Sequence, residues 1–251
     1  MTSSEKDKID GAKLIRAILE NMHDSLKWLW LIIMGFSLVN AIEVYVKLLS
    51  LEKVTNPYDL LRLFLVAPTL VFFSFILVFI RFYLGDSRFL DLSYKETQYS
   101  RGLGAELKKY SGRKRATDIM LLLSHGIFFY FMSFHIGNAY YYVYFFIILM
   151  VVNVIWLWLQ ILARIGSNHY KGPDELIGGM DGTKVLIIWS INNLIFAVVL
   201  ILTVFSDLPQ VQSFFICIGL TILNSIIDFR FTWNYYFPPY HELYKQGKIQ
   251  V

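Results

Sequence analysis

An aspartate and an arginine stand two residues apart where a long apolar run ends, in the stretch "SIIDFRFTWNYYFPP" at 225–239. A carboxylate at the last turn of an apolar helix gains nothing from lipid, and the helix dipole disfavours negative charge there. Asp228 is therefore expected to have a cationic partner. Three arginines near the same membrane edge are candidates for it: Arg81, Arg88 and Arg230.

A second charged segment, "RFYLGDSRFLD" at 81–91, also follows an apolar run, and both segments contain an Arg-Phe pair at the expected membrane edge, at 81–82 and 230–231. We expect the two segments to form one cytoplasmic salt-bridge cluster. It either ties two helical hairpins together or moves during gating, and both alternatives are open. The members of this cluster are Arg81, Asp86, Arg88, Asp91, Asp228 and Arg230.

Polar side chains also occur inside the apolar runs. Asparagines in hydrocarbon need partners, and interhelical hydrogen bonds contribute about 0.6–2 kcal/mol each. Alternatively, some of these side chains line a water-filled path. Glu43 lies near the outer end of the first run and is a candidate cation-attracting site at an outer mouth. These intramembrane polar or pore candidates are Asn40, Glu43, Asn153, Gln160, Asn193, Thr221 and Asn224.

A basic stretch, "KKYSGRKR" at 108–115, precedes the third apolar run. Clusters of lysine and arginine beside a membrane helix bind anionic lipid headgroups. The same charges also suit a phosphorylated ligand, because arginine forms paired hydrogen bonds with phosphate. The candidate residues for either role are Lys108, Lys109, Arg113, Lys114 and Arg115.

The sequence indicates no catalytic or metal chemistry. Cys217 has no disulfide partner, and His125 and His135 fall in one expected helix, with no histidine in any other run to complete a haem or metal site. His125 is expected to bond to an asparagine or to the backbone. Metalloprotease, hydrolase and nucleotide-binding signatures are missing, so we expect no enzyme activity, no cofactor and no metal.

The composition predicts the kind of structure that holds these polar and charged residues. The chain of 251 residues is 56% hydrophobic and 17% charged, whereas soluble domains have about 25% charged residues. Residues 119–163 contain no Asp, Glu, Lys or Arg. This stretch is long enough for two membrane spans of about 20 residues each.

We predict an all-α integral membrane protein with six transmembrane helices arranged as three hairpins. An amphipathic N-terminal helix at 1–25 precedes a transmembrane domain at 26–230, and a tail follows at 231–251. Cytoplasmic loops are expected at 81–117 and 164–184. The predicted spans lie near 26–46, 63–80, 119–135, 140–163, 185–206 and 211–227.

The basic residues predict the orientation. Of the 23 Lys and Arg residues, 20 fall on the side that holds both termini and the two long loops, and the others are Lys47, Lys53 and Arg62. Positive charge accumulates on the cytoplasmic side of membrane proteins. Both termini are therefore expected in the cytoplasm, with the chain in a bacterial inner membrane.

These features favour a homo-oligomeric channel or pore-forming effector, gated from the cytoplasm by an anionic ligand or a partner protein. One bundle is poor in polar groups, so the path is expected between copies. A bacterial defence system is one fitting setting. The alternative is a non-conducting anchor or scaffold that recruits a cytoplasmic partner, and an intramembrane enzyme is a third hypothesis. The net charge of +4 does not indicate nucleic-acid binding.

Overall fold

The described part of the chain is entirely built from long helices. A computed structural model describes residues 3–50, 67–91, 112–165 and 182–237. The helices are α1 (Ser3–Ser50), α3 (Ala67–Leu90), α5 (Gly112–Phe134), α6 (Ala139–Ile165), α7 (Gly182–Val204) and α8 (Gln210–Tyr236). All six contain a stretch long and apolar enough to cross a membrane. The predicted all-helical fold with six candidate spans is confirmed.

The sequence explains where several helices begin. Pro68 lies in the first turn of α3, and Pro209 directly precedes α8, where a missing amide hydrogen costs no helical bond. Between α5 and α6 the chain turns through 135–138. There the side chain of Asn138 accepts a hydrogen bond from the Tyr141 amide at 3.4 Å and caps the start of α6. Helices are the expected structure here, since a helix satisfies its own backbone in hydrocarbon.

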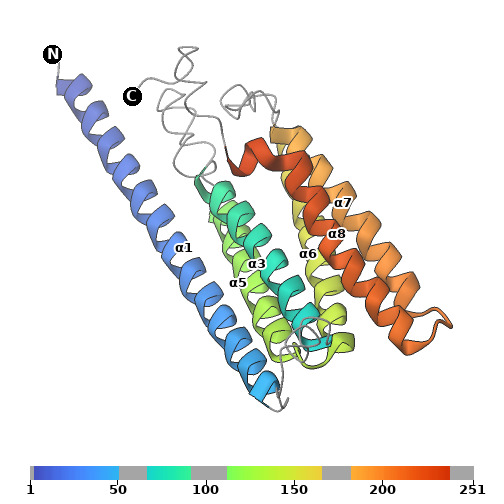
Figure 1. The fold of residues 1–251 in the computed structure, drawn as a ribbon. Coiled ribbons are helices and arrows are strands. Elements are labelled where there is room, and N and C mark those ends of the chain that lie inside the picture. The colour runs from blue at the N-terminus through green and yellow to red at the C-terminus, as the bar shows by residue number, and fades with distance from the viewer. Residues whose placement is uncertain (1–2, 51–66, 92–111, 166–181, 238–251) are drawn as a thin grey trace.

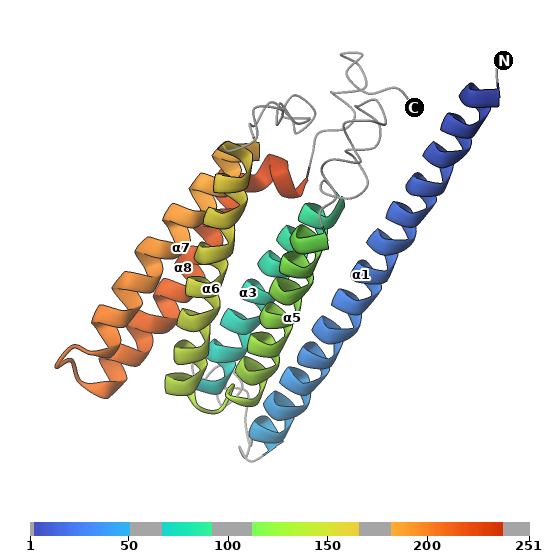
Figure 2. The same cartoon turned by 180° about the vertical axis from the view of Figure 1, so that it is seen from behind.

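The helices form a bundle with α1 at one edge and α7 and α8 at the other (Figure 1). Helix α1 packs on α5 and α3, α3 also contacts α8, and α6 lies between α5 and α7. We call the end where α1 begins and α3, α6 and α8 finish the upper end, and the opposite end the lower end. The first part of α1 projects past the upper end of the other helices, as both views show (Figures 1 and 2).

Two apolar clusters make up the core. The larger one includes Trp30, Phe75, Phe129 and Phe146, and the smaller one lies toward the upper end around Trp156, Trp189 and Tyr235. Along α6 the last buried residue of the larger cluster is Met150, and the first of the smaller cluster is Trp156. On α7 the gap lies between Trp189 and Phe196, and on α8 between Ile218 and Tyr235. Buried polar side chains occupy these gaps, so a polar layer lies between the two clusters on α6, α7 and α8.

Helices α3 and α8 both extend further than the sequence predicted. Helix α3 continues through Leu90, so its charged residues are helical and do not form part of a loop. Helix α8 continues past the predicted end at Ile227 to Tyr236. The helices continue through these charged residues because buried partners compensate the charges.

The end of α8 is kinked at Thr232, whose backbone angles (φ −117°, ψ 17°) are not helical. Its hydroxyl donates to the Asp228 carbonyl at 2.7 Å and accepts from the Trp189 indole at 3.2 Å. The last turn therefore bends across the upper end of the bundle (Figure 1). Tyr235 and Tyr236 are buried, while Phe231, Trp233 and Phe237 are exposed. Only part of this aromatic run therefore has the exposed position typical of a membrane-interface belt.

Gly126 allows α5 to approach α1 closely, and this contact can be tested. A Cβ atom at Gly126 would lie 2.1 Å from Cγ2 and 3.2 Å from Cβ of Ile33. We expect Gly126→Ala to lower the free energy of unfolding by about 1–3 kcal/mol, as overpacking usually does. Thermal unfolding in detergent, followed by circular dichroism, measures the change.

Gly219→Ala is the matched control, because nothing lies within 4 Å of a Cβ built at that helical position. It should leave the protein equally stable, or more stable by about 0.5–1 kcal/mol because alanine favours helix. Equal melting temperatures for the two variants would contradict the close packing of α1 on α5.

Candidate functional site

A buried arginine connects three helices in the polar layer. Arg81 on α3 donates from Nε to Oδ2 of Asp228 on α8 at 2.9 Å, and both side chains are almost fully buried. Its two terminal nitrogens donate to the side-chain oxygens of Asn224 on α8 and Asn193 on α7. Each guanidinium nitrogen thus has a partner, as a charge in a low-dielectric interior requires.

A second buried pair continues the layer into α5 and α6. His125 Nδ1 lies 2.9 Å from Oδ2 of Asp86, and the ring is fully buried. Asn153 places its Nδ2 3.4 Å from His125 Nε2, and Asn193 donates to Asn153 Oδ1 at 2.9 Å. This arrangement fits the tautomer with the proton on Nδ1, because Nε2 then accepts from the amide.

Tyr236 completes the layer from the end of α8. Its hydroxyl donates to Oδ2 of Asp228, which the kink at Thr232 makes possible. The other carboxylate oxygen, Oδ1, and the Nδ2 atom of Asn224 are buried without a hydrogen-bond partner among the described residues. We call the connected set the polar core. It consists of Arg81, Asp86, His125, Asn153, Asn193, Asn224, Asp228 and Tyr236.

A small cavity lies between the two charged pairs. Its volume is about 20 Å³, and Arg81, Asp86, Asn193 and Tyr236 all contribute to its lining. A cavity needs roughly 10–15 Å³ and two to four polar partners to hold one water molecule. This one meets both conditions, so it can accommodate one water within reach of both pairs.

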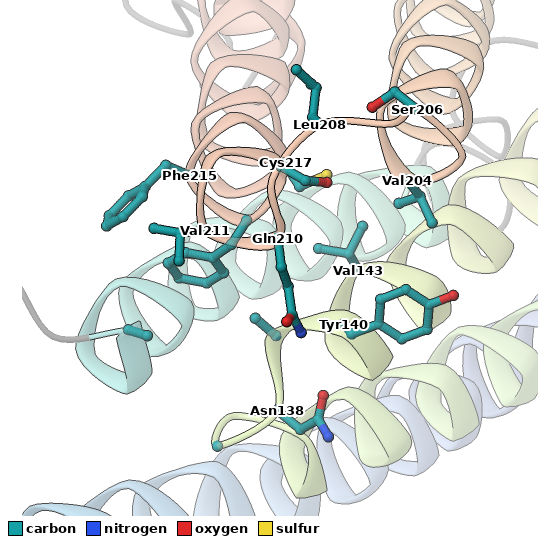
Figure 3. Close-up of a pocket in the computed structure, with 15 residues that line it drawn as sticks. Asn138, Tyr140, Val143, Val204, Ser206, Leu208, Gln210, Val211, Phe215 and Cys217 are labelled. Carbon is teal, nitrogen blue, oxygen red and sulfur yellow. The ribbon is translucent and has the colours of Figure 1, made fainter.

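A larger cavity of about 660 Å³ opens at the lower end, between the start of α6, the end of α7 and the start of α8 (Figure 3). Val143, Val204 and Cys217 supply apolar walls. Figure 3 shows Gln210 reaching across the opening toward the turn that carries Asn138. The cavity therefore has an apolar interior and a few polar groups.

One face of α8 connects the large cavity with the polar core. Residues spaced three or four apart lie on one helix face. On α8 that face is small or polar throughout its length: Ser213, Cys217, Thr221, Asn224, Ser225, Asp228, Thr232 and Tyr236. All of these except Ser213 are buried, and Ser213 and Cys217 line the large cavity. We call this face the α8 polar face.

A third charged contact lies at the upper end, where α3 meets α1. Asp91 Oδ1 accepts from Lys27 Nζ at 3.0 Å and lies 2.8 Å from Nε2 of the buried His23. Partial burial alone would raise the pKa of Asp91, but the hydrogen bonds and charges of Lys27 and His23 outweigh it. The pKa of Asp91 is therefore below its ordinary value.

The six residues expected in one salt-bridge cluster belong to different contacts. Arg81 is the partner of Asp228, Asp86 pairs with His125, and Asp91 pairs with α1. The reason is the length of α3, where positions five residues apart differ in depth by about 7.5 Å. Arg230 is exposed, because two residues further along α8 the side chain faces away from Asp228. Arg88 is buried near the end of α3.

Most of the intramembrane polar candidates are buried inside the helix bundle. The buried ones are Asn153, Gln160, Asn193, Thr221 and Asn224. Gln160 donates to Asp118 at 3.3 Å, and Thr221 donates to the Cys217 carbonyl at 2.9 Å. They are thus enclosed by one bundle and are not spread over a surface between copies. Asn40 is half-buried and donates to Ser133 at 2.7 Å, while Glu43 is exposed.

The basic stretch is only partly described. Lys108 and Lys109 lie outside the described residues. Arg113, Lys114 and Arg115 belong to the first turn of α5. That turn begins the helix that carries His125, so the basic stretch is continuous with the polar core through α5.

Sequence reasoning missed the Asp86–His125 pair, Asp118 and Tyr236. For Tyr236 the helical spacing gave only the side of α8, since eight residues of straight helix would place it about 12 Å from Asp228 and the kink at Thr232 is needed for contact. The predicted helix end at Ile227 hid this relation. For Asp86 and His125 the sequence contains no comparable signal, since the two residues meet across two helices.

No protein-family model, curated protein sequence or solved structure matches the chain. Among the residues that the structure describes, no three His, Cys, Asp or Glu side chains gather in a group that could hold a metal ion.

Asp228→Asn should destabilise the protein strongly, because the Arg81 charge would stay buried without its counter-charge. Breaking one side of a buried pair costs about 3–5 kcal/mol. Arg230→Gln is the control and should leave the melting temperature in detergent unchanged. The double variant Arg81→Leu, Asp228→Leu should lose less stability than the two single leucine variants together. Additive losses would contradict a direct pairing.

Asp91→Asn should destabilise the protein at neutral pH but not in acid. A lowered pKa in the folded protein means that the ionised group adds stability above the ordinary aspartate value of about 3.9. This stability disappears as the pH falls below that value and through the lowered pKa. The gap in melting temperature between wild type and Asp91→Asn should therefore close below about pH 4. Glu20→Gln, at an exposed position of α1, should show no such gap.

Proposed function

We propose that this protein is a gated membrane channel in which the path runs through the interior of each chain. The observation that carries the proposal is the enclosed α8 polar face, which leads from the large lower cavity to the polar core. Ionisable groups inside a membrane bundle are costly and typically mark an ion pathway. The path lies within one bundle, whereas the sequence alone favoured a path between copies.

The narrow part of the path lies between the lower cavity and the polar core. Cys217 lines the cavity, and Asn224 is the first polar-core residue along α8. About 10 Å of helix separates them. Thr221 lies between them, and its hydroxyl is bonded to its own backbone. Apolar side chains of the larger core cluster, Ile218 among them, flank this section, which makes it a suitable hydrophobic gate.

Gating from the upper end fits the charge distribution. Most of the Lys and Arg residues belong to segments that adjoin this end, so in our proposal it faces the cytoplasm of a bacterial cell. The basic stretch at 108–115 includes the first turn of α5. An anionic ligand or partner bound there would exert a force on the helix that carries His125. Movement of α5 would then alter the polar core directly, since His125 contacts both Asp86 and Asn153.

We propose that copies of the chain associate, so that several paths lie side by side. The outer surface of the bundle is apolar, with exposed Phe36, Leu202 and Phe205 among many others, and suits either lipid or another copy. The role as an effector in a bacterial defence system stays a hypothesis that no described residue addresses.

One observation favours a second candidate, a membrane anchor that recruits a partner. The part of α1 before Glu20 precedes the apolar span of that helix and projects past the bundle (Figure 2). Such an extension can hold a cytoplasmic partner through a helix–helix contact. An anchor of this kind needs no path through the bundle.

Thr221→Val tests the channel directly, because it removes a hydroxyl from the narrow section at nearly constant volume. We expect ion flux through reconstituted liposomes to fall by about tenfold, the effect of a barrier raised by 1.4 kcal/mol. Thr203→Val is the matched control: Thr203 also donates to its own helix backbone, but it lies on α7 beside Ser213, outside the narrow section between Cys217 and Asn224.

Flux of K⁺, Na⁺, Cl⁻ and H⁺ should be measured in parallel with release of an enclosed dye. Equal effects of the two threonine variants would contradict the proposed path. Vesicles that pass no ion under any voltage, pH gradient or anionic ligand would overturn the channel and leave the anchor.

A further inference from the structure

The polar core consists of two buried pairs that can each hold or release a proton. Asp86 and His125 form one pair, and Asp228 with Tyr236 forms the other. Arg81 donates to Asp228 in the second pair. Asp86 and Tyr236 both line the small cavity. A space that fits one water molecule therefore lies beside one member of each pair.

We infer that the ion that crosses is the proton, and that Tyr236 and one water in the small cavity pass it between the Asp86–His125 pair and Asp228. This inference rests on the proposed channel function and names its substrate. Hydrogen-bonded chains of acidic and histidine residues carry protons in other membrane proteins. A tyrosine hydroxyl can join such a chain because it both donates and accepts.

The dimensions of the site exclude larger ions from the middle of the path. A cavity of about 20 Å³ holds one water and no hydrated metal ion or chloride. A proton needs no open lumen, because it moves by exchange along hydrogen bonds.

Protons and charge are conserved in this transfer. His125 starts as the neutral tautomer with its proton on Nδ1. A proton that arrives at Nε2 displaces the Asn153 contact, and the ring releases its Nδ1 proton to Asp86, which passes a proton to the water. The water gives one of its protons to the Tyr236 oxygen while Tyr236 hands its own proton to Oδ2 of Asp228. His125 ends neutral and Asp228 ends protonated, while Asp86, the water and Tyr236 return to their starting forms. One proton has moved and no bond other than O–H and N–H has changed.

Two further features fit this inference. Oδ1 of Asp228 has no hydrogen-bond partner among the described residues, although it is fully buried. Because Oδ1 is unengaged, the protonated carboxyl keeps one oxygen available as a hydrogen-bond acceptor while the other carries the proton. Asp91, which is partly exposed, lies about 7.5 Å further along α3 than Asp86, toward the upper end.

Tyr236→Phe tests the relay, because it removes the hydroxyl and keeps the ring that packs on Trp189. We expect proton flux into liposomes, followed with an enclosed pH dye under a K⁺ diffusion potential, to fall by about a hundredfold, as for loss of a positioned proton donor. Tyr142→Phe is the matched control, since Tyr142 is equally buried but bonds to Ser74 outside the polar core. Circular dichroism and gel filtration establish that both variants fold.

Other outcomes separate this inference from the channel proposal. Flux of K⁺ or Cl⁻ without proton flux would overturn the inference and leave the channel. Equal proton flux in wild type and Tyr236→Phe would also overturn it. A second measurement needs no flux: infrared difference spectra after a pH jump should contain a carboxylic-acid carbonyl band that shifts in D₂O and disappears in Asp228→Asn. A wild-type spectrum without that band would overturn proton binding at Asp228 even if the protein conducts.

Discussion

A guanidinium cannot lie in the middle of an apolar bundle unless other helices compensate its charge and satisfy its hydrogens. Arg81 imposes this requirement on α7 and α8, which supply Asn193, Asn224 and Asp228. Asp228 in turn requires Tyr236, and Tyr236 reaches it only because α8 bends at Thr232. A single charged side chain therefore accounts for buried polar residues on two neighbouring helices and for the shape of one helix end.

The polar layer also determines how the helices are aligned. Apolar side chains pack about as well against lipid as against each other, so burial alone leaves neighbouring membrane helices free to slide or rotate. Hydrogen bonds have defined lengths and directions, and here they join α3, α5, α6, α7 and α8 at one level. The aromatic contacts above and below, such as Phe89 with Trp156, then pack in one register.

The number and approximate position of the helices could be predicted from the sequence, because the length of an apolar run reflects the thickness of a bilayer. The need of Asp228 for a cation was also predictable, since the cost of burying a charge depends only on its surroundings. That the partner is Arg81 could not be predicted, because the pairing depends on where α3 and α8 end. The Asp86–His125 pair and the kink at Thr232 arise from contacts between helices, which no periodicity within one helix encodes.

The length of α1 has a mechanical consequence. Ile33 packs closely on Gly126 of α5, and about 45 Å of helix extends from there to Ser3 against about 25 Å to Ser50. A rigid rod held at that point acts as an unequal lever. A force at the projecting tip would be magnified at the short arm, and the contact of His23 and Lys27 with Asp91 lies on the long arm as a brake. Helix α1, which lies at the edge of the bundle, thereby has a mechanical advantage over it.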